Sequence, residues 1–359
     1  MNNHDKVKVT VSGVSATMLF ALQGRAHLSK EYRSLFYDAK AVELVEKIDY
    51  DFSTDDMPFV GVMHNLIRKG YLPQMYSVGA LIAKQFDDKI KAYIAEHPRA
   101  SVVNLGAGLD ATFYRVDNGT IHWYDLDLPA AIDVRRQLLP EPERVTYIAK
   151  SLLDPGWCKD IEHTEDGVFV IAEAVFQFFD EPQMRQFFSM LADNFPGGEI
   201  AFTAMSRSDC FRGWFDMLPP EQLEAMRAVW MEAMKDWWEK VPADQKDKAV
   251  TALKTPTKPN GTEWSDLEAW WKQLSDEENA EAMRDLMSSS IAMPIPGDRV
   301  DMWPPKDANE FTKWDSRFIV IDQLSVSKNI PRGLLSADMQ RFMDYFDERG
   351  GSNIFHLRV

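Results

Sequence analysis

Residues 101–129 read SVVNLGAGLDATFYRVDNGTIHWYDLDLP, and this stretch decides the fold. Its first five residues, SVVNL, have the length and apolar character of a short buried β-strand. Gly106 and Gly108 follow where that strand would turn into a helix. Glycine allows a tight turn there and lets a ligand approach the main chain closely. A second strand ends at Asp125 and Asp127, about 20 residues after the loop, where an acid that binds a cofactor ribose is expected.

The two aspartates at the end of the second strand face the same way, because side chains alternate along a strand. Asp127 lies nearer the tip, so it is the predicted ligand of the ribose hydroxyls. The glycines could instead make a tight turn with no ligand. Their position between a strand and a helix, with acids at the right distance, favours cofactor binding.

Strand and helix patterns alternate along the rest of the chain. Further strands are predicted at 120–126, 144–150, 167–176, 198–205, 317–326 and 353–359, with helices at 109–116, 129–139, 181–195 and 336–350. This alternation predicts an α/β fold with a mostly parallel, doubly wound sheet.

Three regions are distinguished along the chain. Residues 1–100 are predicted to be a mainly helical N-terminal cap, and 101–206 with 315–359 form the α/β core. Residues 207–314 have no strand pattern, and nine of the eleven tryptophans fall between Trp214 and Trp314. This block is interpreted as a helical insert that forms a lid and substrate region, with most of its tryptophans in its own core.

Composition limits the partners of the chain. The 359 residues carry a net charge of −16, which argues against a nucleic-acid or anionic-membrane surface. The chain has two cysteines, no secretory signal and no apolar run long enough to span a bilayer. A cytoplasmic protein is expected, with a small-molecule substrate and no membrane or nucleic-acid partner. Nothing in the sequence predicts its oligomeric state.

The glycine loop has two candidate cofactor classes. With Ala111 it fits G-x-G-x-x-A, the relaxed fingerprint of nicotinamide and flavin sites. Asp110 argues against them, because a carboxylate in the first helical turn would repel the pyrophosphate that rests there. S-adenosylmethionine carries a sulfonium, an ammonium and one carboxylate but no phosphate. It is therefore the predicted cofactor.

The segment 102–119 followed by WYDLDLP resembles the leucine carboxyl methyltransferase family. The likeness is closer to its bacterial small-molecule branch, the tetracenomycin-type polyketide O-methyltransferases, and covers about residues 15–206. It implies a class I methyltransferase (Rossmann-like) sheet of seven strands with the last strand antiparallel, and S-adenosylmethionine as cofactor.

The resemblance also implies contacts. Ser151 and Leu152 would frame the adenine, Glu173 would lie beside the methionine end, and Arg25 and Lys84 would hold the methionine carboxylate. The predicted cofactor-binding residues are therefore Arg25, Lys84, Gly106, Ala107, Gly108, Asp127, Leu128, Ser151, Leu152 and Glu173.

The chain departs from the family at two places. Ile82 stands where relatives have an arginine that would help to hold the carboxylate. Ala174, Val175 and Phe178 stand where relatives commonly have glycine, leucine and tyrosine, which removes one possible hydroxyl contact to the substrate. Arg115 is interpreted as a structural partner of the acids on the second strand.

Methyl transfer from a sulfonium mainly requires alignment of the reactants and exclusion of water. A general base helps but is not obligatory when the acceptor is already an anion. His64 is the one candidate base. The sequence therefore predicts an S-adenosylmethionine-dependent O-methyltransferase acting on a small molecule, a phenol or carboxylate such as a polyketide-like metabolite. Two alternatives remain: a protein C-terminal carboxyl methyltransferase, and a non-catalytic binding protein that retains the fold.

Overall fold

The structure is a computed structural model, and it describes most of the chain. The described residues are 6–11, 13–50, 74–205, most of 231–282, 307–349 and 352–359.

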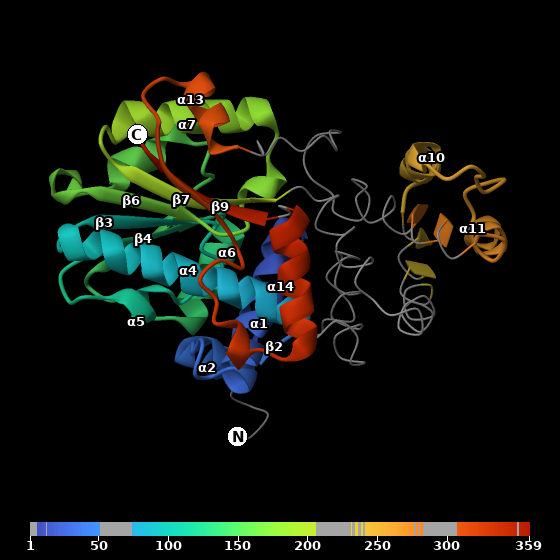
Figure 1. Cartoon of the computed structure of the whole chain (residues 1–359), viewed down its shortest axis with the longest axis horizontal. Coiled ribbons are helices and arrows are strands. Elements are labelled where there is room, and N and C mark those ends of the chain that lie inside the picture. Colours follow the sequence, from blue (N-terminus) through green and yellow to red (C-terminus); the bar gives the residue numbers. More distant parts are fainter. Residues whose placement is uncertain are drawn as a thin grey trace.

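A seven-stranded sheet forms the centre of the molecule (Figure 1). Its strands are β3 (Ser101–Leu105), β4 (His122–Asp127), β5 (Val145–Ala149), β6 (Val168–Ala172), β7 (Glu199–Met205), β8 (Ile319–Ser325) and β9 (Ser352–Arg358). They lie in the order β5-β4-β3-β6-β7-β9-β8, and β9 runs antiparallel to β7 and β8. This order confirms the predicted class I methyltransferase sheet with an antiparallel last strand.

Helices cover both faces of the sheet, as a doubly wound fold requires. On one face, α4 (Gln74–Glu96), α5 (Phe113–Val116) and α6 (Pro129–Leu138) contribute to an apolar cluster with the strands. On the other, α7 (Glu181–Asn194) and α13 (Phe311–Trp314) do the same. Figure 1 shows α7 and α13 above the sheet and α4 and α5 below it.

The N-terminal part adds α1 (Thr17–Glu31) and α2 (Ala39–Lys47), and α1 packs against both α2 and α4. Two very short strands, β1 (Val7–Lys8) and β2 (Ile48–Asp49), pair in parallel beside them. The sequence did not predict this pair, because two residues are too few to show a strand pattern. At the other end of the chain, α14 (Ala337–Arg349) packs against α4.

Two predicted boundaries were wrong. The helix expected from residue 109 begins only at Phe113, because left-handed backbone at Gly106 and Gly108 extends the turn before it. The strand expected over 167–176 ends at Ala172, because Ala174 also adopts a left-handed conformation, with φ of 54°. A short 3₁₀ helix, η5 (Phe176–Phe178), follows.

Between β7 and β8 the structure describes α10 (Ala243–Ala252) and α11 (Trp264–Trp271). Trp238, Trp270 and Trp271 are buried there, and the Trp238 indole N–H donates to the Thr262 carbonyl oxygen over 2.7 Å. These three tryptophans pack as core residues, as their helical spacing predicted. Residues 207–230, the first part of the predicted insert, lie outside the described residues.

Gly167, just before β6, provides a test of the packing of α4 against the sheet. Its φ is 102°, and a Cβ there would lie 2.8 Å from the Tyr93 hydroxyl oxygen on α4. Gly167→Ala should lower the free energy of unfolding by about 3 kcal/mol, because backbone strain and overpacking add. Gly119→Ala is the control: φ is 87° but the space beside it is open, so the loss should be about 1 kcal/mol. Urea unfolding followed by circular dichroism measures both, and equal losses would contradict the assigned contact.

Candidate cofactor-binding site

The carboxyl ends of β3, β4 and β6 meet at one edge of the sheet and bring the glycine loop, Asp127 and Glu173 to the same region. The Gly108 N–H donates to Asp127 Oδ2 over 2.7 Å, and the Leu128 N–H donates to Asp127 Oδ1 over 2.6 Å. The loop and the predicted ribose ligand are therefore in direct contact. Ligands of open α/β sheets bind at this edge.

Both loop glycines are required by what surrounds them. Gly106 has φ of 62°, and a Cβ there would lie 2.6 Å from Val175 Cγ2. Gly108 has φ of 45°, and its Cβ would lie 2.7 Å from Met18 Cβ. The loop is thus confined between α1 and the segment that follows β6, and neither glycine position has room for a side chain.

The second-strand tip has the features of a ligand site. Burial raises the pKa of Asp127, while its bonds to the Gly108 and Leu128 amides lower it. Leu128 is 42% exposed although it is apolar. A bound adenosine beside the Asp127 carboxylate would cover such a side chain.

Ser151 and Leu152 lie directly after β5, at the same edge. Ser151 is half-buried, and its hydroxyl accepts a bond from the Leu153 N–H over 3.2 Å. Leu152 is buried, and its carbonyl oxygen accepts a bond from the Trp157 indole over 3.0 Å. Their placement next to the β4 tip is compatible with the predicted adenine contact, which stays a prediction.

Glu173 follows β6 at the point where the chain turns sharply. It is half-buried, and within the described part of the chain its carboxylate has no hydrogen bond. Burial raises the pKa of Glu173 to about 7, although the charge of Arg25 opposes that rise. A carboxylate in this situation would gain from a cationic ligand.

Arg25 on α1 is 4% exposed and lies between acids. Its Nε is 3.8 Å from both Asp38 Oδ2 and Asp110 Oδ1, beyond hydrogen-bonding distance. That Nε is buried without a hydrogen-bond partner among the described residues. This guanidinium therefore has a hydrogen-bond donor that the described residues do not use.

Asp110 does not occupy the predicted position in a first helical turn, since α5 begins three residues later. Its Oδ2 instead accepts bonds from the Asn104 side chain and the Thr112 N–H over 3.2 and 3.3 Å. Burial alone would raise the pKa of Asp110, but the charges of Arg25 and Arg115 hold it below its usual value. The argument from Asp110 against a pyrophosphate therefore depends on its negative charge beside the loop and not on the helix dipole.

Arg115 was assigned the wrong partners from sequence. It donates two bonds to Asp87 of α4, over 2.8 and 3.0 Å, and one to Asp38 over 2.6 Å. The basic residue that pairs with the second strand is Arg135 of α6, 2.5 Å from Asp125. Sequence analysis missed this residue, although it lies on the apolar stripe of α6 with Ile132 and Leu138.

Lys84 lies on α4, where its ammonium group pairs with Asp88 over 2.6 Å. It lines a surface groove of about 470 Å³ that Tyr37, Lys91 and Tyr114 also line. In the described part of the chain no hydrogen bond or ion pair joins it to the glycine loop. Ile82, where relatives have arginine, is buried in the apolar cluster beneath the sheet.

His64, the candidate base, lies outside the described residues. His122 stacks on His163 with ring centroids 4.0 Å apart, and His356 pairs with Glu199 over 2.8 Å. No group of three or more His, Cys, Asp or Glu side chains is placed to hold a metal ion in the portion that the structure covers.

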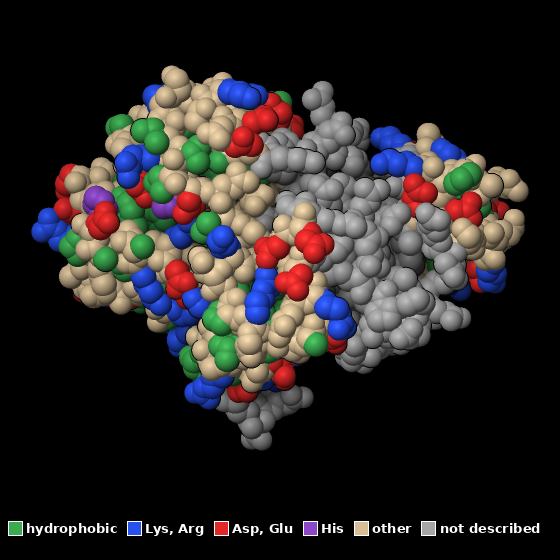
Figure 2. All heavy atoms as spheres, in the orientation of Figure 1, with side chains coloured by type: hydrophobic (Ala, Val, Ile, Leu, Met, Phe, Trp, Pro, Cys, Tyr) green, Lys and Arg blue, Asp and Glu red, His purple; other side chains and the backbone are tan. Residues whose placement is uncertain are grey.

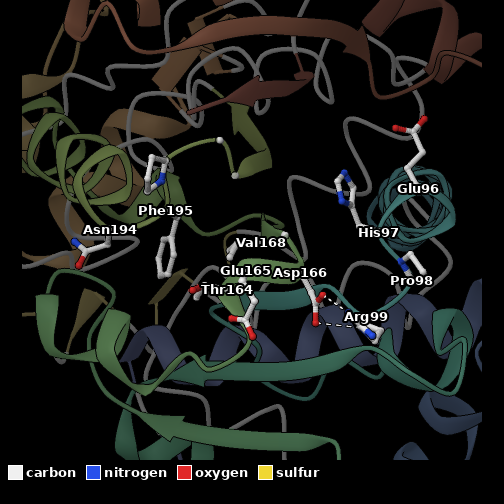
Figure 3. Close-up of a pocket in the computed structure, with 14 residues that line it drawn as sticks. Glu96, His97, Pro98, Arg99, Thr164, Glu165, Asp166, Val168, Asn194 and Phe195 are labelled. Carbon is white, nitrogen blue, oxygen red and sulfur yellow. Dashed lines mark hydrogen bonds and ion pairs between the residues drawn. The ribbon is translucent and has the colours of Figure 1, made fainter.

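Another cavity, of about 670 Å³, lies at the amino ends of the strands (Figure 3). It lies between the end of α4, with His97 and Arg99, and the end of α7, with Phe195. In its lining, Arg99 donates to both carboxylate oxygens of Asp166. Because this cavity adjoins the amino ends of β3 and β6, it is separate from the glycine-loop site.

Figure 2 shows Lys and Arg intermixed with Asp and Glu on the face drawn. Among the helices in the described ranges, none is both long and apolar enough to cross a membrane.

The residues at the glycine loop fit S-adenosylmethionine. The two glycines give the loop a left-handed backbone beside Asp127. Among the described residues, the Glu173 carboxylate has no hydrogen bond and the buried Arg25 Nε has no hydrogen-bond partner. The cofactor carries both a cationic and an anionic group at its methionine end, which these two residues match.

Comparisons with known proteins agree with this fit. Residues 17–191 match the family model for leucine carboxyl methyltransferases. The chain is 29% identical over 203 residues to the tetracenomycin polyketide synthesis O-methyltransferase TcmP of Streptomyces glaucescens, covering 55% of this chain and 68% of that protein. It is 25% identical over 216 residues to the S-adenosyl-L-methionine-dependent methyltransferase dpfgK of Gibberella zeae, covering 56% and 69%.

Among solved structures, a putative methyltransferase from Thermobifida fusca is similar with a TM-score of 0.43, 10% identity and 93% coverage of both chains. The sequence matches and the strand order agree: the chain is an S-adenosylmethionine-dependent methyltransferase, and its residues 17–191 are similar to leucine carboxyl methyltransferases.

Proposed function

We propose that this methyltransferase transfers a methyl group to an oxygen atom, phenolic or carboxylic, of a small-molecule acceptor. The observation that carries the proposal is the 29% identity to TcmP, whose name describes an O-methyltransferase of polyketide synthesis. A polyketide-like aromatic compound is therefore the acceptor class that we favour.

The residues at the glycine loop have separate roles in this proposal. S-adenosylmethionine, when bound, supplies a methyl group activated on a sulfonium. Asp127 accepts hydrogen bonds from the ribose hydroxyls, with Leu128, Ser151 and Leu152 around the adenine. Glu173 attracts the ammonium. Arg25 holds the carboxylate, and Lys84 assists only if its ion pair with Asp88 opens.

The acceptor side is assigned to the cap (residues 1–100) and to the insert (207–314), which would cover the reacting groups and exclude water. Alignment and dehydration supply most of the rate enhancement in such a displacement. His64 is the candidate base for a neutral phenol, and a carboxylate acceptor needs none.

The test uses S-adenosylmethionine with a radioactive methyl group and a panel of aromatic phenols and carboxylic acids. Label should pass to a small-molecule acceptor. Alkali distinguishes the products, because a methyl ester releases its label and an aryl methyl ether does not. A variant in which a short linker replaces residues 207–314 should still bind S-adenosylhomocysteine in calorimetry but lose transfer.

Two results would contradict the proposal. Transfer of label to the carboxyl terminus of a protein and to no small molecule would support the carboxyl methyltransferase alternative. Loss of cofactor binding along with transfer in the deletion variant would show that the insert belongs to the cofactor site or to the core.

Asp127→Asn tests the ribose contact. The substitution removes the negative charge and places an NH₂ group near the hydroxyls and the loop amides. A charge-assisted hydrogen bond is worth about 1.5–3 kcal/mol, so calorimetry should show affinity for S-adenosylhomocysteine falling roughly tenfold to a hundredfold.

Asp125→Asn is the matched control one pleat back on the same strand. Asp125 is fully buried and accepts bonds from Trp123, Asn104 and Arg135. Its loss should lower the free energy of unfolding by about 3 kcal/mol and change affinity much less. If Asp125→Asn lowered the affinity and Asp127→Asn mainly lowered the free energy of unfolding, Asp125 would be the ribose ligand.

Glu173 predicts a pH dependence of cofactor binding. With a pKa of about 7, the carboxylate is mostly protonated at pH 6 and mostly ionised at pH 8. The ionised form attracts the ammonium, so affinity for S-adenosylhomocysteine should rise about tenfold between these values, in proportion to the ionised fraction. The free protein should lose stability over the same rise in pH, because the folded state holds a proton that the unfolded state has released.

Glu173→Gln should bind more weakly at pH 8 and show little change between pH 6 and pH 8. Calorimetry in buffers of matched ionic strength measures both proteins. An equal pH dependence in the wild-type protein and in the variant would assign the titration to another group.

A further inference from the structure

Arg135 connects the glycine loop to the strand that carries the ribose ligand. It lies in the last turn of α6, and its side chain is 2% exposed. One terminal nitrogen, Nη1, donates to the carbonyl oxygens of Gly108 and Asp110 over 3.0 and 2.7 Å. The other, Nη2, donates to Asp125 Oδ2 over 2.5 Å.

The loop is therefore held at Gly108 by hydrogen bonds to two different side chains. The Gly108 N–H donates to Asp127, and the Gly108 carbonyl oxygen accepts from Arg135. These two groups belong to successive peptide planes. Fixing both groups determines the orientation of the backbone at Gly108. Its φ of 45° lies in the left-handed region, which glycine adopts readily and other residues adopt rarely.

Only an arginine can make all these contacts together. Its planar guanidinium presents several N–H donors in a fixed arrangement, whereas a lysine presents one compact ammonium. The guanidinium also lies over the Tyr147 ring, 4.9 Å from the centroid. Burial raises the pKa of Tyr147 to about 12, so this ring is neutral at physiological pH and adds no second negative charge beside Asp125.

We propose that Arg135 is a positioning residue for the cofactor, because it holds the glycine loop in the conformation that receives S-adenosylmethionine. The inference rests on the proposed cofactor contacts at Gly106, Gly108 and Asp127. Arg135 itself lies behind the loop and acts through the Gly108 and Asp110 carbonyls. Without it the loop has the freedom of glycine backbone, and the cofactor must order that backbone when it binds.

Arg135→Lys is the test, because it keeps a positive charge for Asp125 but cannot hold both carbonyls as well. Hydrogen exchange of peptides that cover residues 104–112 should be at least about tenfold faster than in the wild-type protein, as expected for the loss of one or two hydrogen bonds. Affinity for S-adenosylhomocysteine should fall about tenfold or more in calorimetry.

Arg144→Lys is the matched control. Arg144 donates to both carboxylate oxygens of Asp117 over 2.6 Å and to the Ile121 carbonyl oxygen over 3.0 Å, away from the glycine loop. Arg144→Lys should change neither the hydrogen exchange of the loop nor the affinity for S-adenosylhomocysteine. Hydrogen exchange is measured without cofactor, so it tests whether Arg135 holds the loop even if the wild-type protein does not bind S-adenosylhomocysteine. Failure of the wild-type protein to bind would refute the proposed cofactor contacts and not the role of Arg135 in holding the loop.

A double variant, Asp125→Asn with Arg135→Gln, covers the case in which Arg135→Lys does not fold. Removing both charges leaves no uncompensated buried ion, while the carbonyl bonds are still reduced. It should show the same faster exchange and weaker binding. The proposal would be overturned if the loop of either variant exchanged hydrogen as slowly as in the wild-type protein. It would also be overturned if a variant with a faster-exchanging loop bound S-adenosylhomocysteine as tightly as the wild-type protein.

Discussion

The left-handed turn at Gly106 and Gly108 is the constraint on which the cofactor site depends. Three distant parts of the chain contact this turn: Met18 on α1, Asp127 at the end of β4, and Val175 after β6. None of these contacts is local in sequence, so the loop reaches its final conformation only when the sheet and α1 are in place. The site is therefore a product of the whole core and not of a loop motif alone.

Beneath the turn, the chain buries several charges, which is unfavourable unless each charge has a partner. Arg115 forms ion pairs with Asp87 and Asp38, and Arg135 forms one with Asp125. Arg25 lies 3.8 Å from both Asp38 and Asp110, and among the described residues its buried Nε has no hydrogen-bond partner, as is also true of the Arg135 Nε. Arg25 and Arg115 are therefore shared among three carboxylates, those of Asp38, Asp87 and Asp110.

The sequence was sufficient to predict the sheet and the glycine loop, because both depend on local patterns. Strands show apolar runs, and a glycine pair after a strand has few other uses. The charge network could not be derived in this way. Asp38, Asp87 and Arg115 lie on three separate segments, and no spacing within the sequence relates them.

The wrong predictions also arise from contacts between segments that are distant in the sequence. The helix expected from residue 109 starts late because the turn at Gly108 is stabilised by tertiary contacts, which changed the role assigned to Asp110. Arg135 was recognisable in principle, since a charged residue on the apolar stripe of a helix indicates a buried partner. The neighbouring Arg136 made that choice ambiguous until the position of the helix on the sheet was known.

Ala174 shows how the site affects the backbone beside it. Its φ of 54° costs an alanine about 1 kcal/mol. The Ala174 N–H donates to the buried Thr203 hydroxyl on β7 over 2.7 Å, which holds this conformation. A straighter path would continue β6 and carry Glu173 into the sheet, with no route for its carboxylate to a ligand. The strain at Ala174 therefore accompanies the position of the half-buried Glu173 at the carboxyl end of β6, and Thr203 on the neighbouring strand stabilises this conformation.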